Sequence, residues 1–294
     1  MTDEAASSPP APKSAGKFAD LRTRILSALV LIAAAVGALV VGDLPFILFW
    51  LAAAIAILWE WQTLVGPVRR RARFVVGAAA LSIACAFAAE NGADVATAVL
   101  ACGAILVGYL ADKGSRLWAG AGVFYAGALI VAIGAIRPPL PSLLEPPYNL
   151  RAILWLFAVV WGTDVMAYFG GRLIGGPKLW PRVSAGKTWS GTIVGIVSGA
   201  LFGLAVAAIA PPGPVAVVPL LVVGLVAAAF AQAGDLLESS VKRHFGVKDS
   251  SRLIPGHGGV MDRLDGFVAS ALFVAILGLA RSAPTVAEGL FVWS

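Results

Sequence analysis

Long runs of apolar residues recur along most of this 294-residue chain, and they constrain its fold more than any other feature. A run of about 20 apolar residues can cross the ~30 Å hydrocarbon core of a bilayer as a helix. Only 13% of the residues are charged, so a water-soluble fold would lack the polar side chains needed to cover its surface. The sequence therefore predicts an all-α, polytopic membrane protein.

We expect about nine membrane-spanning helices, joined by short turns or by polar loops. Each predicted span is a mainly apolar run that ends near charged residues, glycine or proline. In chain order the predicted spans are residues 25–41, 44–64, 74–89, 95–111, 117–136, 152–169, 192–210, 214–233 and 266–280.

The runs divide the chain into three predicted parts. Residues 1–20 are rich in Pro, Ala and Ser and lack periodicity, so we expect a disordered cytoplasmic tail. Residues 21–150 hold the first five spans, and five prolines between residues 137 and 151 predict an extended connector after them. Residues 151–294 hold spans six to nine and two long polar loops, and we expect them to be the catalytic part.

The distribution of Lys and Arg predicts the side of the membrane on which the polar loops lie. With a cytoplasmic N-terminus and nine spans, all but three of the 22 Lys and Arg residues fall on the cytoplasmic side. The exceptions are Arg137, Arg151 and Arg281. We therefore expect an active site at the cytoplasmic membrane face.

The longest polar segment, residues 239–265, lies between two apolar runs. Asp235, Glu238, Ser239 and Lys242 share one helix face if the eighth helix continues beyond residue 233. Asp262 and Asp265 are three residues apart at the start of the ninth helix and also share a face. Solvated helix ends are the alternative interpretation. Two acidic faces at one membrane level favour a hard cation such as Mg²⁺.

The same segment carries groups that suit a polyphosphate. Lys and Arg residues are interleaved with the acids, and a metal surrounded by cations neutralises phosphate charge. Gly258 and Gly259 let backbone N–H groups approach a phosphate closely. His257 is expected to donate to a phosphate or to cap the turn. With only His244 as its companion, it makes a poor zinc signature.

The second polar loop, residues 170–191, contains Ser-Ala-Gly-Lys-Thr at 184–188. It resembles a phosphate-binding loop, but it lacks the glycine spacing and the preceding strand of a Walker A motif, which argues against a P-loop ATPase. Its lysines, hydroxyls and glycines can still neutralise a triphosphate.

Two acids lie within apolar runs. Asp164 is costly at membrane depth, so an ion or substrate site is favoured over a structural ion pair. Glu60 lies between Trp59 and Trp61, and we expect this Trp-Glu-Trp sequence to anchor the protein at a membrane interface.

From position 239 the sequence reads S-x-V-K-R-x4-K-D-x-S-x2-I-P-x-H-G-G-V-x-D-R-L-D. This segment resembles the signature of phosphatidate cytidylyltransferases (CDP-diacylglycerol synthases), with every fixed position filled. The likeness extends over about residues 160–270. The sequence departs from the usual family pattern at Ala185 and Ser190, where the family has Pro and Glu, and at Val165, where it has Thr.

The resemblance implies an enzyme of phospholipid biosynthesis that converts CTP and phosphatidate to CDP-diacylglycerol and pyrophosphate. The short spacing of the spans and their Trp-rich ends suggest a bacterial inner membrane. The resemblance also implies Mg²⁺ and a second cation, with Asp235 and Asp262 as metal ligands. The implied catalytic residues are Asp235, Lys242, Arg243, Lys248, Asp249, His257, Asp262, Arg263 and Asp265. The implied substrate-binding residues are Asp164, Ser184, Lys187, Thr188, Ser239, Gly258 and Gly259.

Two other functions remain open at this point. A CTP-dependent lipid-alcohol kinase would transfer the γ-phosphoryl group instead of the cytidylyl group. A transporter or channel would use Asp164, Asp235 and Asp262 as an ion path, and it would predict internal repeats that the sequence does not show. We expect the bilayer and the lipid as partners and no nucleic acid, and the sequence leaves a homodimer open.

Overall fold

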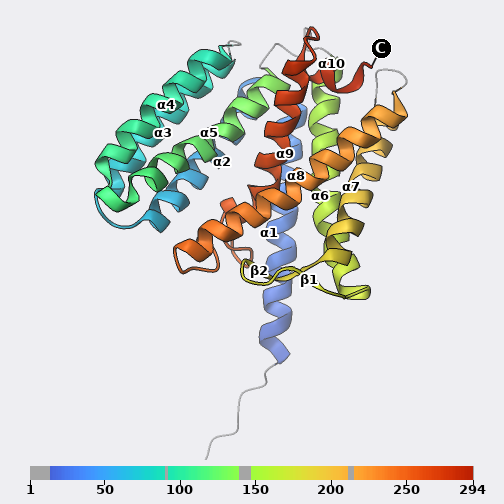
Figure 1. The fold of residues 1–294 in the computed structure, drawn as a ribbon, viewed down its shortest axis with the longest axis horizontal. Helices are drawn as coiled ribbons and strands as arrows, with labels where there is room; N and C mark the ends of the chain where they lie inside the picture. The colour runs from blue at the N-terminus through green and yellow to red at the C-terminus, as the bar shows by residue number, and fades with distance from the viewer. Residues whose placement is uncertain (1–13, 90–91, 139–146, 211–214, 294) are drawn as a thin grey trace, which may run out of the picture.

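A computed structural model of the chain describes residues 14–89, 92–138, 147–210 and 215–293. This part of the chain is almost entirely helical (Figure 1). In chain order the elements are α1 (Ser14–Val41), α2 (Asp43–Val65), α3 (Arg70–Ala89), α4 (Ala93–Leu110), η1 (Lys113–Ser115), α5 (Arg116–Ile136), α6 (Pro147–Leu173), β1 (Lys178–Trp180), β2 (Ser184–Thr188), α7 (Trp189–Ile209), α8 (Val217–His244), α9 (Met261–Ala280) and α10 (Val286–Phe291).

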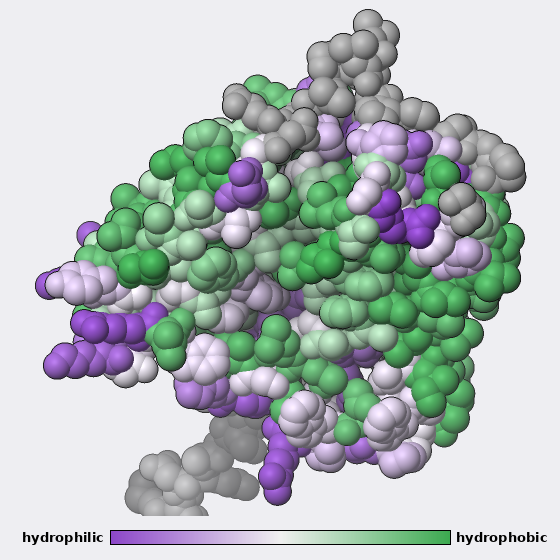
Figure 2. Space-filling model, turned by 45° about the horizontal axis from the view of Figure 1, so that its top comes forward, coloured by the Kyte–Doolittle hydropathy of each residue, from purple (hydrophilic) through white to green (hydrophobic). Residues whose placement is uncertain are grey.

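The predicted all-α polytopic membrane architecture is confirmed. Within the described ranges, 8 helices, α2 to α9, are long and apolar enough to cross a membrane by length and composition. The first predicted span corresponds to a shorter apolar stretch, Leu26–Val41, at the end of α1. Large hydrophobic side chains are exposed on every helix from α1 to α9, and hydrophobic residues cover much of the face shown in Figure 2. Such a surface suits contact with lipid.

Several element boundaries differ from the prediction. Helix α1 begins at Ser14, so the end of the predicted tail is helical, and residues 1–13 lie outside the described range. Helix α6 begins at Pro147, because a proline in the first helical turn sacrifices no hydrogen bond. The connector residues 139–146 lie outside the described range. Helix α8 continues past residue 233 to His244, so its polar end carries site residues on one face.

The second polar loop contains two short strands, which the all-helical prediction did not include. Strands β1 and β2 pair antiparallel, with Lys178 opposite Thr188. Thr188 also begins α7, because its Oγ1 accepts a hydrogen bond of 3.1 Å from the backbone nitrogen of Gly191. The β1–β2 hairpin lies at the end of the molecule where α1 begins, far from α10 (Figure 1).

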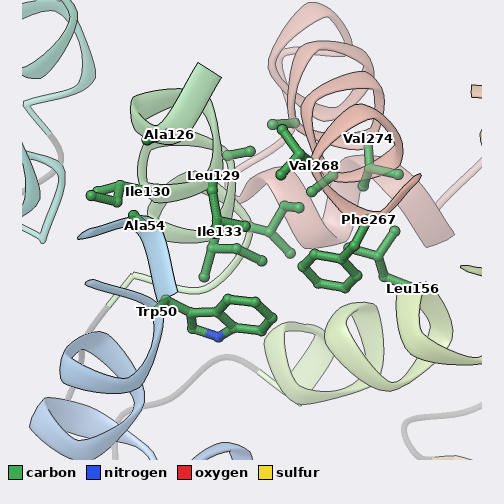
Figure 3. Close-up of a cluster of buried hydrophobic side chains, with 14 of the residues drawn as sticks. Trp50, Ala54, Ala126, Leu129, Ile130, Ile133, Leu156, Phe267, Val268 and Val274 are labelled. Carbon is green, nitrogen blue, oxygen red and sulfur yellow. The ribbon is translucent and has the colours of Figure 1, made fainter. Parts of the chain in front are cut away.

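Aromatic packing fixes the start of α9 in the core (Figure 3). The core side chains come from α2, α5, α6 and α9, and they include Leu129 and Leu156. Trp50 of α2 stacks on Phe267 of α9, with ring centroids 4.9 Å apart and planes inclined by 3°. Because Phe267 closely follows Asp265 in the sequence, this stack holds the acidic first turns of α9 against α2.

The three arginines that break the predicted charge pattern bind helix ends. Each guanidinium donates to a carbonyl oxygen at the C-terminal end of a helix: Arg137 to Leu39, Arg151 to Ala207 and Arg281 to Val292. Each also lies over an aromatic ring, at 4.8, 4.8 and 3.6 Å from the centroid respectively. A cation at a helix C-terminus is stabilising. Their departure from the charge pattern therefore has a structural explanation.

Candidate active site

A cavity of about 1210 Å³ lies among α1, α2, α6, the hairpin, α8 and α9. One wall is apolar and aromatic, and it includes Leu31, Ile32, Phe49, Trp50, Phe157 and Trp161. The other end is charged and polar, and it includes Asp164, Lys187, Gln232, Asp235, Asp262, Arg263 and Asp265. The cavity therefore combines charged groups with an apolar and aromatic lining.

Most of the predicted site residues meet at this cavity. Those that line it are Asp164, Ser184, Lys187, Thr188, Asp235, His257, Asp262, Arg263 and Asp265. Ser239, Lys242 and Gly259 do not line it but bond to its aspartates, and Gly258 lies beside Asp262, since a Cβ atom on it would meet Oδ2 at 2.7 Å. The remaining three, Arg243, Lys248 and Asp249, are exposed and do not line it.

Asp262 is held by donors from three directions. Its Oδ1 lies 2.7 Å from Nζ of Lys242, and its Oδ2 accepts from the backbone nitrogens of Gly259, at 2.8 Å, and Ser250, at 3.1 Å. The same lysine nitrogen lies 2.6 Å from Oε2 of Glu238, whose side chain is fully buried. Lys242 therefore joins two carboxylates and does not point freely into the cavity as a phosphate clamp would.

Asp235 is paired with the hairpin. Nζ of Lys187 lies 2.8 Å from Oδ2 of Asp235 and 3.1 Å from Oε1 of Gln232. Ser239, one helical turn later, donates to Oδ1 of Asp235 at 3.3 Å. Gln232 was not predicted from the sequence, because an amide one turn before Asp235 inside an apolar run carries no motif. These contacts dock the Ser-Ala-Gly-Lys-Thr strand onto α8.

The departure at position 190 has a structural counterpart. Ser190, where the family pattern has Glu, donates to the carbonyl oxygen of Gly175 and lies 3.1 Å from Oγ1 of Thr188. The serine therefore closes the base of the hairpin.

Asp164 makes no ion pair or hydrogen bond with any other residue that the structure describes. It lines the cavity from α6, and the acids of α8 and α9 line the same cavity. The structural ion pair considered from the sequence is thus absent among the described residues. Asp265, in contrast, accepts a 2.7 Å hydrogen bond from the backbone nitrogen of Gly266.

His257 is linked to α1. Its Nδ1 lies 2.7 Å from Oγ of Ser27, and that hydroxyl donates to the carbonyl oxygen of Pro255 at 3.0 Å. The imidazole is therefore anchored to α1 through Nδ1, and the residue lines the cavity. His244 is exposed and stacks on Trp118 with ring centroids 4.4 Å apart.

The expectation that Glu60 anchors a membrane interface is wrong. Its side chain is fully buried, and the carboxylate accepts hydrogen bonds from the segment that leads into α9. Trp61 is also buried and donates to the carbonyl oxygen of Trp118 at 2.7 Å. The sequence did carry a signal for this buried role: Glu60 lies within an apolar run, and a carboxylate in such a run usually has a specific partner.

The carboxylates fit a hard divalent cation in their chemistry. Within the described ranges, no group of three or more His, Cys, Asp or Glu side chains is arranged to hold a metal. Mg²⁺, however, is commonly held by one or two carboxylates together with water and substrate phosphates. Asp235 and Asp262 line the same cavity and match that pattern. The residues therefore fit a Mg²⁺ shared with a phosphate ligand.

Comparison with known proteins gives consistent matches. A family model described as "Cytidylyltransferase family" matches residues 22–280. Two proteins named "Phosphatidate cytidylyltransferase", from Brucella abortus (strain 2308) and Brucella melitensis, are each 39% identical over 276 residues, or 93% of this chain and 99% of the relative. A protein of that name from Staphylococcus saprophyticus is 47% identical over 120 residues, or 41% of this chain and 46% of that protein. The family match covers every residue that lines the cavity.

Proposed function

Because the chain belongs to the cytidylyltransferase family, we infer that it is an enzyme that transfers the cytidylyl group of CTP to phosphatidate. The products are CDP-diacylglycerol and pyrophosphate. The relatives that align along almost the whole chain carry the name of this activity.

The cavity is the observation that carries this inference. A two-tailed lipid phosphate needs a site that is apolar along one wall and charged at one end. Here the wall of α1, α2 and α6 meets the charged end of α8 and α9 within one cavity. We propose that the lipid tails lie along the apolar wall. The phosphate of phosphatidate and the triphosphate of CTP then lie at the charged end.

The chemistry follows from the charges. An oxygen of the phosphatidate phosphate attacks the α-phosphorus of CTP, a new P–O–P linkage forms, and the α–β bond breaks as pyrophosphate leaves. The attacking phosphate is already ionised, so no strong general base is required. The main cost is bringing two polyanions together. Lys187 and Arg263 line the cavity and would neutralise them.

We propose that Asp235 and Asp262 hold Mg²⁺ and that a second cation binds at the same end. Bound there, the metal supplies charge neutralisation and alignment of the phosphates. Lys242 holds Asp262 in place rather than contacting substrate, as its two ion pairs indicate. The predicted catalytic roles of Arg243, Lys248 and Asp249 stay predictions, because none of the three lines the cavity.

The multi-pass membrane protein is proposed to lie in a bacterial inner membrane with its charged cavity end at the cytoplasmic face. Bacterial relatives and the distribution of Lys and Arg support this placement. A homodimer, which the sequence leaves open, would be detected by light scattering of the detergent-solubilised protein.

Pyrophosphate release tests the function. Purified protein in detergent should release pyrophosphate only when CTP, phosphatidate and Mg²⁺ are all present. Asp262→Asn should lose most of the rate. Absence of release from the wild type would overturn the function, and a normal rate in Asp262→Asn would overturn the role of that aspartate.

A further inference from the structure

Glu60 of α2 binds the segment that carries Asp262. Its Oε1 accepts from the hydroxyl of Ser251 at 2.6 Å and from the backbone nitrogen of Val260 at 2.8 Å. Its Oε2 accepts from the hydroxyl of Ser250 at 3.1 Å and from the backbone nitrogen of Met261 at 2.7 Å. Two backbone groups at the start of α9 and two hydroxyls of the preceding loop therefore share one carboxylate.

The contacts of Glu60 alternate with those of Asp262. Ser250 gives its hydroxyl to Glu60 and its backbone N–H to Asp262. Gly259 gives its N–H to Asp262, and the next residue, Val260, gives its N–H to Glu60. The loop is thus fixed between two carboxylates, and moving one of them moves the donors of the other.

The environment of Glu60 is closed and contains no cation partner among the described residues. Its side chain is fully buried, and the residue takes part in none of the ion pairs found there. The N-terminus of α9 compensates the negative charge, since a carboxylate is stabilised by the first N–H groups of a helix. A Cβ atom on Gly259 would lie 2.6 Å from Oε1 of Glu60, so backbone and carboxylate are in close contact.

We propose that Glu60 is a positioning residue for the reaction: it sets the 250–261 loop and, through that loop, the place of the Asp262 carboxylate. The proposal rests on the proposed function, because Asp262 is taken there as a metal ligand. Glu60 itself does not line the cavity. It acts through the donors that it shares with Asp262 along the loop.

The test compares Glu60→Gln with a matched control. Glutamine keeps the size of the side chain but turns one acceptor oxygen into a donor, which then faces a backbone N–H. The control is Gln62→Met on the same helix, which removes a buried hydrogen bond of 2.8 Å to the carbonyl oxygen of Ala119 without touching the loop. Each purified variant is measured for kcat, KM for CTP, thermal unfolding, and hydrogen–deuterium exchange of residues 250–262.

In Glu60→Gln we expect faster exchange in the loop and a kcat lower by about 100-fold, the cost of misplacing a reacting group by about 1 Å. The KM for CTP should change by less than about 3-fold, because Glu60 does not touch substrate. Gln62→Met should keep wild-type exchange in the loop and wild-type kcat. Unchanged loop exchange in Glu60→Gln, or a kcat equal to that of Gln62→Met, overturns the proposal.

The role of Glu60 can also be decided if the wild type is inactive or if Glu60→Gln does not fold. If the wild type makes no CDP-diacylglycerol, the proposed function fails, while loop exchange still decides whether Glu60 holds the loop. If Glu60→Gln does not fold, Ser251→Ala takes its place in the same measurements. This variant removes one of the four hydrogen bonds that Glu60 accepts. Faster loop exchange with a lower kcat in Ser251→Ala supports the proposal, and wild-type values for both overturn it.

Discussion

Nζ of Lys242 lies 2.7 Å from Oδ1 of Asp262, and this ion pair joins the polar end of α8 to the first turn of α9. The same nitrogen lies 2.6 Å from the buried carboxylate of Glu238. One lysine thus fixes the spacing between two helices that both contribute acids to the cavity. The role of Lys242 is therefore to hold the Asp262 carboxylate in position.

Replacing Lys242 with Met should lower both stability and activity. The substitution leaves Glu238 buried without its cation, and loss of one partner of a buried pair costs about 3–5 kcal/mol. Thermal unfolding in detergent should therefore shift to lower temperature. Adding Glu238→Gln removes the buried charge, so the double variant should recover most of the stability while activity stays low. Recovery of full activity in the double variant would show that Lys242 has no role at Asp262.

Gly259→Ala should disrupt the loop. A Cβ atom at this position would lie 1.9 Å from Oγ of Ser250 and 2.6 Å from Oε1 of Glu60. Overpacking of this kind costs about 1–3 kcal/mol, and here the strain acts on the donors of Asp262. We expect a lower unfolding temperature and a large loss of pyrophosphate release. Gly114→Ala is the control, because a Cβ there meets no atom of the described residues within 4 Å. Equal behaviour of the two variants would contradict the packing described here.

The two lysines of the hairpin should differ sharply. Lys187 lies 2.8 Å from Asp235 inside the cavity, whereas Lys178 is exposed and, among the described residues, bonds only to the carbonyl oxygen of Gly186, at 3.5 Å. Lys187→Met should lower kcat/KM for CTP by about 100- to 1,000-fold, as expected for loss of a preorganised charge. Lys178→Met should change it by less than about 3-fold, in line with a solvated charge. Steady-state kinetics with varied CTP measures both. A similar loss in the two variants would indicate a general electrostatic effect of the hairpin.

The sequence predicted the fold where the signal is local. Each membrane helix is long and apolar by itself, so the spans could be recognised one at a time. The polar end of α8 and the first turn of α9 carry no hydropathy signal. The sequence alone could therefore not show that they are helical, and the prediction assumed that both helices extend beyond their apolar runs. The hairpin was missed because strand β1, Lys178–Trp180, has only three residues.

The site was predictable where its residues lie within one motif. Lys187 and Asp262 stood out as charged residues in the two polar loops and Asp235 as an acid just before the later of them in the chain, and the structure brings all three to one cavity. Glu60 could not be assigned in this way, because its partners lie between 190 and 201 residues later in the chain. Only tertiary packing shows that an acid of α2 belongs to the loop before α9.

Ser27→Ala should weaken the link between α1 and His257. The variant loses the 2.7 Å contact to Nδ1 and the hydrogen bond to Pro255. A net hydrogen bond contributes about 1 kcal/mol, so kcat/KM should fall by about 2- to 10-fold. Ser82→Ala is a suitable control, since that exposed hydroxyl donates within α3, to the carbonyl oxygen of Ala78. Equal kcat/KM values for Ser27→Ala and the wild type would show that the link does not influence the reaction.

The fate of labelled phosphorus in CTP tests the central claim most directly. The enzyme is incubated with phosphatidate, Mg²⁺ and CTP that carries the label at either the α- or the γ-position, and lipid and aqueous products are separated. A cytidylyltransferase places the α-label in the lipid fraction, as CDP-diacylglycerol, and the γ-label in pyrophosphate. Asp235→Asn and Asp262→Asn should both lose the labelled lipid. Appearance of the γ-label in the lipid would show phosphoryl transfer instead and would contradict the function proposed for this cavity.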